Sequence, residues 1–140
     1  MLVLAAAGAV IAAYLSVVRA TGGSAVCDAS HGCDIVAASP YAVILGIQVA
    51  YLGLGFALLL VAATASWWWT ADPRALRVAW GLLLLGTLFV AYLTFLELFV
   101  IKAVCAWCAA FALTIVLGLV VAATALRRAG GAATDPSRTR

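Results

Sequence analysis

Charged residues are scarce in this chain, making up 9% of its 140 residues, whereas hydrophobic residues make up 68%. Together with a mean hydropathy of +1.22, this scarcity excludes an ordinary soluble domain. Short segments of alternating polarity are also lacking, which excludes a membrane β-barrel. The few basic residues fall at the ends of apolar segments and form no patch, so the composition gives no reason to expect nucleic acid as a partner.

The apolar residues instead form four long uncharged runs, each near or above the roughly 18 to 20 residues that cross a bilayer as a helix. We predict an all-α integral membrane protein, a bundle of four transmembrane helices in a lipid bilayer. The helices are expected at about residues 1–18, 40–63, 76–101 and 103–126. The single domain then spans residues 1–128, with a loop at 19–39 and a disordered tail at 129–140. The first run lacks a basic leader segment and a clear cleavage site, so we expect a helix there and not a signal peptide.

The basic residues predict the orientation of this bundle. Four crossings put both termini and the connection at 64–77 on one side of the membrane. That side holds six arginines: Arg74, Arg77, Arg127, Arg128, Arg138 and Arg140. The other side holds only Arg19 and Lys102. By the positive-inside rule, both termini and the tail are cytoplasmic and the loop is exoplasmic, in a cell's inner (plasma) membrane.

The four cysteines all fall on the predicted exoplasmic side, where disulfides persist. Cys27 and Cys33 lie in the loop, and Cys105 and Cys108 open the last apolar run. Residues three apart share a helix face, so the second two can pair, and a helix N-terminus favours the thiolate form.

Two cysteine pairs on one side of a bundle suggest a relay by thiol–disulfide exchange, in which one pair must move to reach the other. We expect Gly22, Gly23 and Gly32 to loosen the loop and supply that mobility. Two other interpretations stay open at this point: a non-catalytic scaffold with two static disulfides, and a metal site. The exoplasmic location and the wide spacing of the loop pair disfavour metal.

Other polar and small residues carry weaker signals. Ser39 followed by Pro40 predicts the capped start of the second helix. Glu97, an acid inside an apolar run, is either functional or paired with Lys102 near the surface. We interpret His31 as a solvated loop residue. Within the second helix, Gln48 is expected to hydrogen-bond either a neighbouring helix or a ligand, and three glycines are expected to allow close helix packing: Gly46, Gly53 and Gly55.

Four motifs follow one another along the chain: Cys27-x5-Cys33; Cys33-Asp34-Ile35-Val36-x-x-Ser39-Pro40-Tyr41; Leu45-Gly46-Ile47-x-x-Ala50-x-Leu52-Gly53; and Glu97 followed by Cys105-x-Trp107-Cys108. In this order they resemble the vitamin K epoxide reductase family, in its compact bacterial form without a fused thioredoxin-like domain. The resemblance covers nearly the whole chain except the first residues and the tail. It implies a quinone reductase that makes disulfides in thioredoxin-like partner proteins.

The resemblance also implies a role for each cysteine. Cys108 is similar to the cysteine that reacts with the quinone, and Cys105 to its partner in the helical pair. Cys33 is similar to the loop cysteine that attacks Cys105, and Cys27 to the one that meets the partner protein. Ser39 matches the serine that lies near the quinone.

From this resemblance we expect a membrane thiol oxidase whose electron acceptor is a quinone of the ubiquinone or menaquinone type, with no metal. The expected partner is a separate exoplasmic thioredoxin-like protein of the DsbA type, soluble or membrane-tethered. An enzyme used mainly to reduce quinone or quinone epoxide is the alternative. Ala112, where animal members carry a tyrosine, weighs against epoxide reduction, and Gln48 replaces a proline that bacterial members usually have.

Overall fold

The structure, a computed structural model, describes residues 1–27 and 31–133, with side chains as far as residue 129. Its elements are α1 (Leu2–Ala20), α2 (Gly32–Ala38), the 3-10 turn η1 (Pro40–Ala42), β1 (Val43–Ile44), β2 (Ile47–Gln48), α3 (Val49–Thr70), α4 (Pro73–Phe95), the π-helical turn η2 (Leu96–Ile101) and α5 (Ala106–Ala133). The predicted tail at 129–140 is helical as far as Ala133 and otherwise lies outside the described residues.

Four helices are long and apolar enough to cross a membrane: Leu2–Ala20, Val49–Thr70, Pro73–Ile101 and Ala106–Ala129. The predicted all-α membrane bundle with a cysteine-bearing loop between its first two long helices is therefore confirmed. In the described part of the chain, β structure is limited to the two-residue strands β1 and β2.

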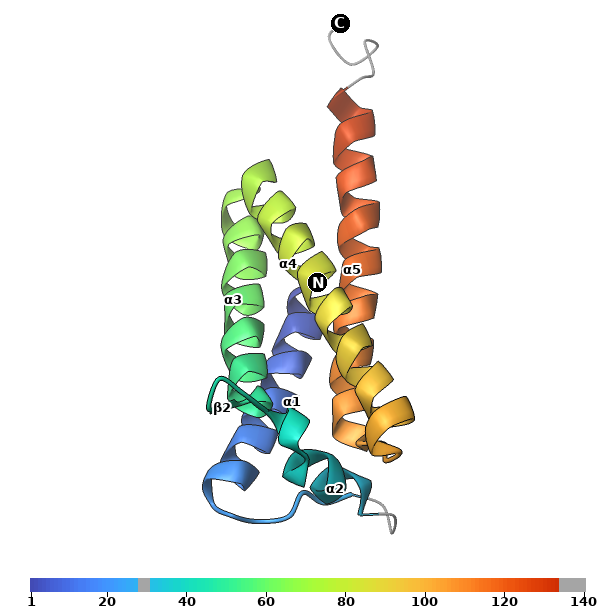
Figure 1. Cartoon of the computed structure of the whole chain (residues 1–140). Helices are drawn as coiled ribbons and strands as arrows, with labels where there is room; N and C mark the ends of the chain where they lie inside the picture. The colour runs from blue at the N-terminus through green and yellow to red at the C-terminus, as the bar shows by residue number, and fades with distance from the viewer. Residues whose placement is uncertain (28–30, 134–140) are drawn as a thin grey trace, which may run out of the picture.

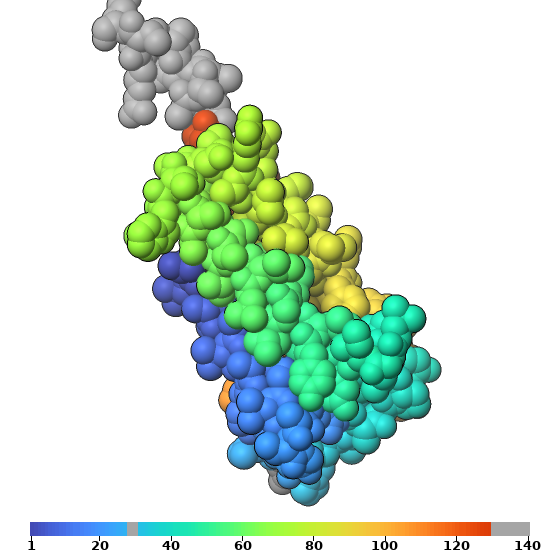
Figure 2. All heavy atoms as spheres, turned by 90° about the vertical axis from the view of Figure 1, so that its left-hand side faces the viewer, coloured from blue at the N-terminus to red at the C-terminus, as the bar shows by residue number. Residues whose placement is uncertain are grey.

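The four long helices form a ring in which each one packs against two others, in the order α1, α3, α4, α5. Successive helices run in opposite directions, so the segment from α1 to α3 and the turn from η2 to α5 lie at the same end (Figure 1). Figure 2 shows α3 along one face, with the segment that follows α2 over the lower end of the bundle. We call this lower end, which carries the cysteines, the cysteine end.

The connection between α3 and α4 shows why these two helices end and begin where they do. Ala71 adopts a left-handed conformation with φ 50°, which stops α3. The Asp72 side chain then accepts a hydrogen bond of 2.8 Å from the Arg74 N–H, and Pro73 occupies the first helical position. An acidic N-cap followed by proline is a strong start signal, so α4 begins at residue 73 and not at 76 as expected.

The second long helix begins at Val49 and not at Pro40. Between the two residues lie η1 and an antiparallel hairpin that pairs Val43 with Gln48. The hairpin turn is formed by Leu45 and Gly46, both at positive φ (52° and 81°), as tight two-residue hairpin turns require. Gly46 therefore serves a turn and not helix packing.

The expected cap at Ser39 is also absent. Its hydroxyl donates a hydrogen bond of 2.7 Å back to the Val36 carbonyl oxygen, closing the end of α2. Gln48, placed inside a helix by the sequence analysis, lies in β2 just before α3.

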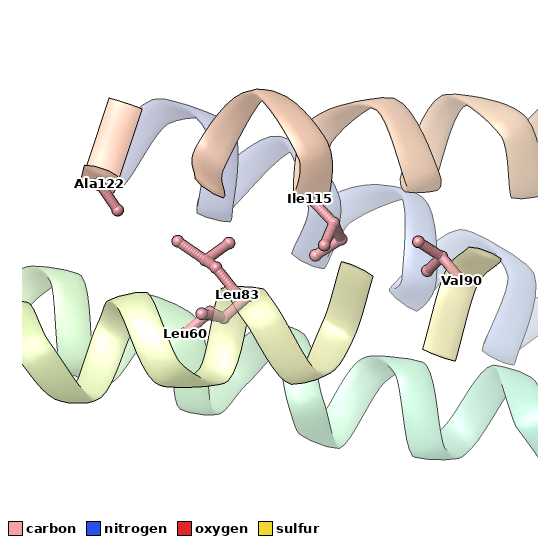
Figure 3. Close-up of a cluster of buried hydrophobic side chains, with 5 residues drawn as sticks. All are labelled: Leu60, Leu83, Val90, Ile115 and Ala122. Carbon is pink, nitrogen blue, oxygen red and sulfur yellow. The ribbon is translucent and has the colours of Figure 1, made fainter. Parts of the chain in front are cut away.

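The hydrophobic core lies between α3, α4 and α5 (Figure 3). Its buried side chains are Leu60, Leu83, Val90, Ile115 and Ala122. Small residues let the helices approach closely here, as is usual for helices in lipid. A methyl group on Gly118 would lie 2.9 Å from Leu83, whereas one on Gly53 or Gly55 would have nothing within 4 Å. Close-packing glycines thus lie in α4 and α5, at Gly86 and Gly118, and the two predicted in α3 have no such neighbour.

Candidate functional site

Cys27 and Cys33 are joined by a disulfide, with their Cα atoms 6.1 Å apart. Cys33 lies in the first turn of the short helix α2 and is buried, whereas Cys27 lies in the preceding loop and is half-buried. The two sulfurs therefore differ in access. A protein in water meets the Cys27 side of this bond more easily than the Cys33 side.

Cys105 and Cys108 open α5 as free thiols. Cys105 immediately precedes the helix, and its Sγ accepts a hydrogen bond of 3.3 Å from the backbone N–H of Cys108. A sulfur in this N-cap position replaces the oxygen that usually satisfies the first-turn N–H groups. Hydrogen bonding from the Cys108 side chain lowers the pKa of the Cys105 thiol most, and the Cys108 backbone N–H lowers it further, although burial opposes this. Cys105 is 2% exposed and Cys108 is half-buried.

Glu97 lies in the π-helical turn η2 and is only 6% exposed. One of its carboxylate oxygens, Oε2, accepts a hydrogen bond of 3.3 Å from the Cys105 N–H. The turn ends at Lys102, which adopts a left-handed conformation with φ 56°. Glu97 is therefore buried beside the cysteines. This position agrees with the interpretation of Glu97 as a functional residue and disagrees with the interpretation that it pairs with Lys102 near the surface.

The residue before Cys27 is held by two aromatic side chains. The Val26 N–H donates a hydrogen bond of 3.0 Å to the Tyr14 hydroxyl oxygen, and Trp107 Nε1–H donates one of 2.9 Å to the Val26 carbonyl oxygen. The two rings pack with their centroids 4.8 Å apart. Sequence analysis assigned no role to Tyr14 or Trp107. The position of Trp107 between the cysteines was the only available hint.

A cavity of about 400 Å³ opens between the helices at the cysteine end. Three of the four cysteines line it, namely Cys33, Cys105 and Cys108, while Cys27 lies outside it. Polar and charged residues also line it: Arg19, Asp34, Ser39, Gln48, Thr94 and Glu97. Most of the wall is apolar and includes Leu15, Phe56, Phe89, Leu93, Phe111 and Ala112. The volume falls within the usual range for small-molecule sites, and an apolar wall with a few polar groups is their usual lining.

The structure thus brings together the predicted site residues except for Cys27, which is joined to them through its disulfide. Within the described residues, no group of three or more His, Cys, Asp and Glu side chains is arranged to hold a metal ion. His31 is exposed, in a left-handed conformation just before α2.

Comparison with known families places these features in context. The family model described as "Vitamin K epoxide reductase family" matches residues 1–123. The match includes all four cysteines and every residue that lines the cavity. No solved structure matches the chain.

Proposed function

This chain belongs to the vitamin K epoxide reductase family, and on that premise we propose that it is a membrane thiol oxidase that passes electrons from a thioredoxin-like protein to a quinone. Members of the family are membrane oxidoreductases that use quinones. The observation that carries the proposal is the cavity that Cys33, Cys105 and Cys108 all line. A loop disulfide and a pair of free thiols meet there beside space for a small apolar molecule.

The cavity suits a quinone head group of the ubiquinone or menaquinone type. Its aromatic and aliphatic walls match a flat apolar ring. Ser39 and Gln48 supply polar groups for a quinone oxygen. The Ser39 hydroxyl donates to Val36 in the present arrangement, so it must rotate before it donates to a bound ring.

The access of each sulfur supports one order of exchange. The partner protein's thiolate attacks Cys27, the more accessible sulfur, and a second attack within the partner leaves it oxidised and the loop pair reduced. The Cys33 thiolate then attacks Cys105 in a Cys105–Cys108 disulfide and displaces the Cys108 thiolate. Cys27 next attacks Cys33, which restores the loop disulfide and releases Cys105. Two electrons have then moved from the partner to the helical pair.

The helical pair hands these electrons to the quinone. Cys108, the less buried of the two, delivers them, and the Cys105 thiolate closes the disulfide on the Cys108 sulfur. The quinone gains two electrons and two protons and leaves as quinol, while two thiols become one disulfide. The structure holds the loop pair bonded and the helical pair free, which corresponds to the stage just before this last step.

The proposal includes an orientation. Six arginines near the termini and the α3–α4 connection, against Arg19 and Lys102 at the cysteine end, favour cytoplasmic termini and exoplasmic cysteines in a plasma membrane. Disulfide formation is maintained in such a compartment through quinone chemistry and not by a thiol buffer.

A direct test uses the purified protein in detergent, with dithiothreitol as the electron donor and short-chain ubiquinone or menaquinone as the acceptor. We expect the wild type to form quinol and Cys108→Ala to lose this activity. Ala109→Ser, at the exposed neighbouring position, is the matched control and should behave as wild type. A wild type with titratable thiols that forms no quinol would overturn the proposal in favour of a static scaffold or a metal site.

A second arm tests the order of exchange with a reduced DsbA-type protein as the donor. Cys27→Ala should no longer oxidise this protein, because the accessible sulfur is gone. If the variant oxidised it at the wild-type rate, the proposed entry point at Cys27 would be wrong.

A further inference from the structure

Gly32, the first residue of α2, lies against the backbone of the turn that precedes α5. A methyl group at this position would collide with the carbonyl oxygen of Val104 and would lie 3.1 Å from its carbonyl carbon. Gly32 is buried. Sequence analysis expected this glycine to loosen the loop, but its lack of a side chain instead allows two backbone segments to touch.

This contact differs from the other tight glycine contacts in the described structure. At Gly86 and Gly118 the nearest atoms belong to the ends of Phe56 and Leu83 side chains, which can turn aside. A backbone carbonyl cannot turn aside without moving its own turn. The contact at Gly32 therefore fixes the position of α2 relative to the turn that precedes α5.

The two residues in contact each directly precede a cysteine. Gly32 precedes Cys33 and Val104 precedes Cys105, and both cysteines line the same cavity. Thiol–disulfide exchange requires the attacking sulfur to approach along the axis of the bond that it breaks. A contact one residue away from each sulfur constrains that approach for Cys33 and Cys105, and it does so less directly for Cys108, which lies three residues after Cys105 in the first turn of α5.

We propose that Gly32 is a positioning residue that seats Cys33 against Cys105 and so selects Cys105 as the sulfur attacked by the loop. This inference rests on the proposed function, since it concerns the exchange step between the two pairs. A helix of seven residues has too few turns to hold its place by itself, so α2 depends on such contacts and on its disulfide. A displacement of about 1 Å in a reacting group costs on the order of 100-fold in rate.

The test isolates the exchange geometry from quinone chemistry. In a Cys27→Ala/Cys108→Ala background, only Cys33 and Cys105 remain, and diamide oxidises them to a disulfide that peptide mapping by mass spectrometry quantifies. We expect Gly32→Ala to slow formation of this disulfide by about tenfold or more. Gly55→Ala, at an exposed helical glycine with open space around it, is the matched control and should form the bond at the background rate. An equal rate in Gly32→Ala would overturn the proposal.

A second measurement leaves Gly32 unchanged, so it can be made even if the Gly32→Ala variant does not fold. The rate of Cys33–Cys105 bond formation is compared with the rate of Cys33–Cys108 formation in a Cys27→Ala/Cys105→Ala background. We expect the bond to Cys105 to form at least about tenfold faster. Equal rates would show that the contact selects neither sulfur. Neither assay contains a quinone, so failure of the quinone assay above and failure of this proposal are separate results.

Discussion

The two ends of this bundle are packed differently. At the cysteine end the helices enclose a cavity of about 400 Å³, walled by large aromatic side chains and three cysteines. In the other half, a space of only about 10 Å³ lies between Leu60, Leu83 and Ile115, roughly the minimum that one water molecule needs. We call this half the packed half.

The difference lies in which residues meet at the helix contacts. In the packed half, small residues such as Gly8, Ala57 and Gly118 let the helices approach. At the cysteine end, α4 passes into a π-helical turn, and residues of α2 and of the hairpin strand β2 contribute to the lining of the cavity. π-helical turns often occur at functional sites. One half therefore stabilises the bundle, and the other is free to bind and react.

The largest expected effect tests the packed half. Leu60 is 2% exposed, and Leu60→Ala leaves a void between α3 and its neighbours. We expect the free energy of unfolding to fall by about 2–5 kcal/mol, as for buried leucines generally. Quinone reduction per folded molecule should be unchanged. Reversible unfolding in mixed micelles measures the first quantity, with the exposed Leu59→Ala as control. A large loss of turnover without a loss of stability would contradict the assignment of stability to the packed half and of activity to the cysteine end.

The boundary between the halves is tested at Gly86. A methyl group here would lie 2.6 Å from the Phe56 ring, which lines the cavity, and 3.3 Å from Ile115 in the core. We expect Gly86→Ala to push the ring into the cavity and raise the KM for short-chain quinone by about tenfold, because overpacking costs roughly 1–3 kcal/mol and about 1.4 kcal/mol corresponds to tenfold. Gly81→Ala, with open space around it, should leave KM unchanged.

A smaller effect is expected at the outer edge of the cysteine end. Trp107→Phe keeps the ring on Tyr14 but removes the hydrogen bond to the Val26 carbonyl. Loss of one such bond costs about 1 kcal/mol, or about fivefold in an equilibrium. We expect turnover with a reduced DsbA-type protein to fall by about that factor, because Cys27 is held less firmly. Trp69→Phe, at an exposed tryptophan, is the matched control. An unchanged rate in Trp107→Phe would show that its hydrogen bond to Val26 does not assist the reaction at Cys27.

The smallest effect is a shift in the titration of Cys105. Hydrogen bonding from the Cys108 side chain lowers the pKa of the Cys105 thiol, so its thiolate should form at a lower pH than that of an unperturbed thiol. In Cys108→Ala the side-chain donor is lost, so the pKa of Cys105 should rise. Thiolate absorbance at 240 nm against pH measures both midpoints. A midpoint in the variant at or below that of the wild type would contradict the assigned cause.

Sequence reasoning predicted the spans and the gathering of the cysteines well, because both depend on hydrophobic run length and alternation across the membrane. It misplaced the start of the second long helix, because a short apolar run such as Val43–Ala50 fits a strand, a turn or a helix equally. The sequence also gives no indication that Leu45 adopts a positive φ.

The sequence predicted the cysteines of the candidate site better than the residues that surround them. Motif order identified the two pairs, but spacing along the chain cannot show that Trp107 reaches back 81 residues to Val26. The glycines illustrate the same limit. Gly32 was expected to give flexibility and instead permits a close contact, a distinction that depends on what lies opposite the residue in space.

The central claim is that the helical cysteine pair reduces a quinone bound at the cysteine end. Its most direct test is an anaerobic reaction without added electron donor, in which the fully reduced protein is mixed with excess short-chain quinone and its disulfides are then mapped by mass spectrometry. Four thiols carry four electrons, so the account predicts two quinols per chain, with Cys105–Cys108 and Cys27–Cys33 both oxidised. Quinol formed while Cys105 and Cys108 stay reduced would contradict it.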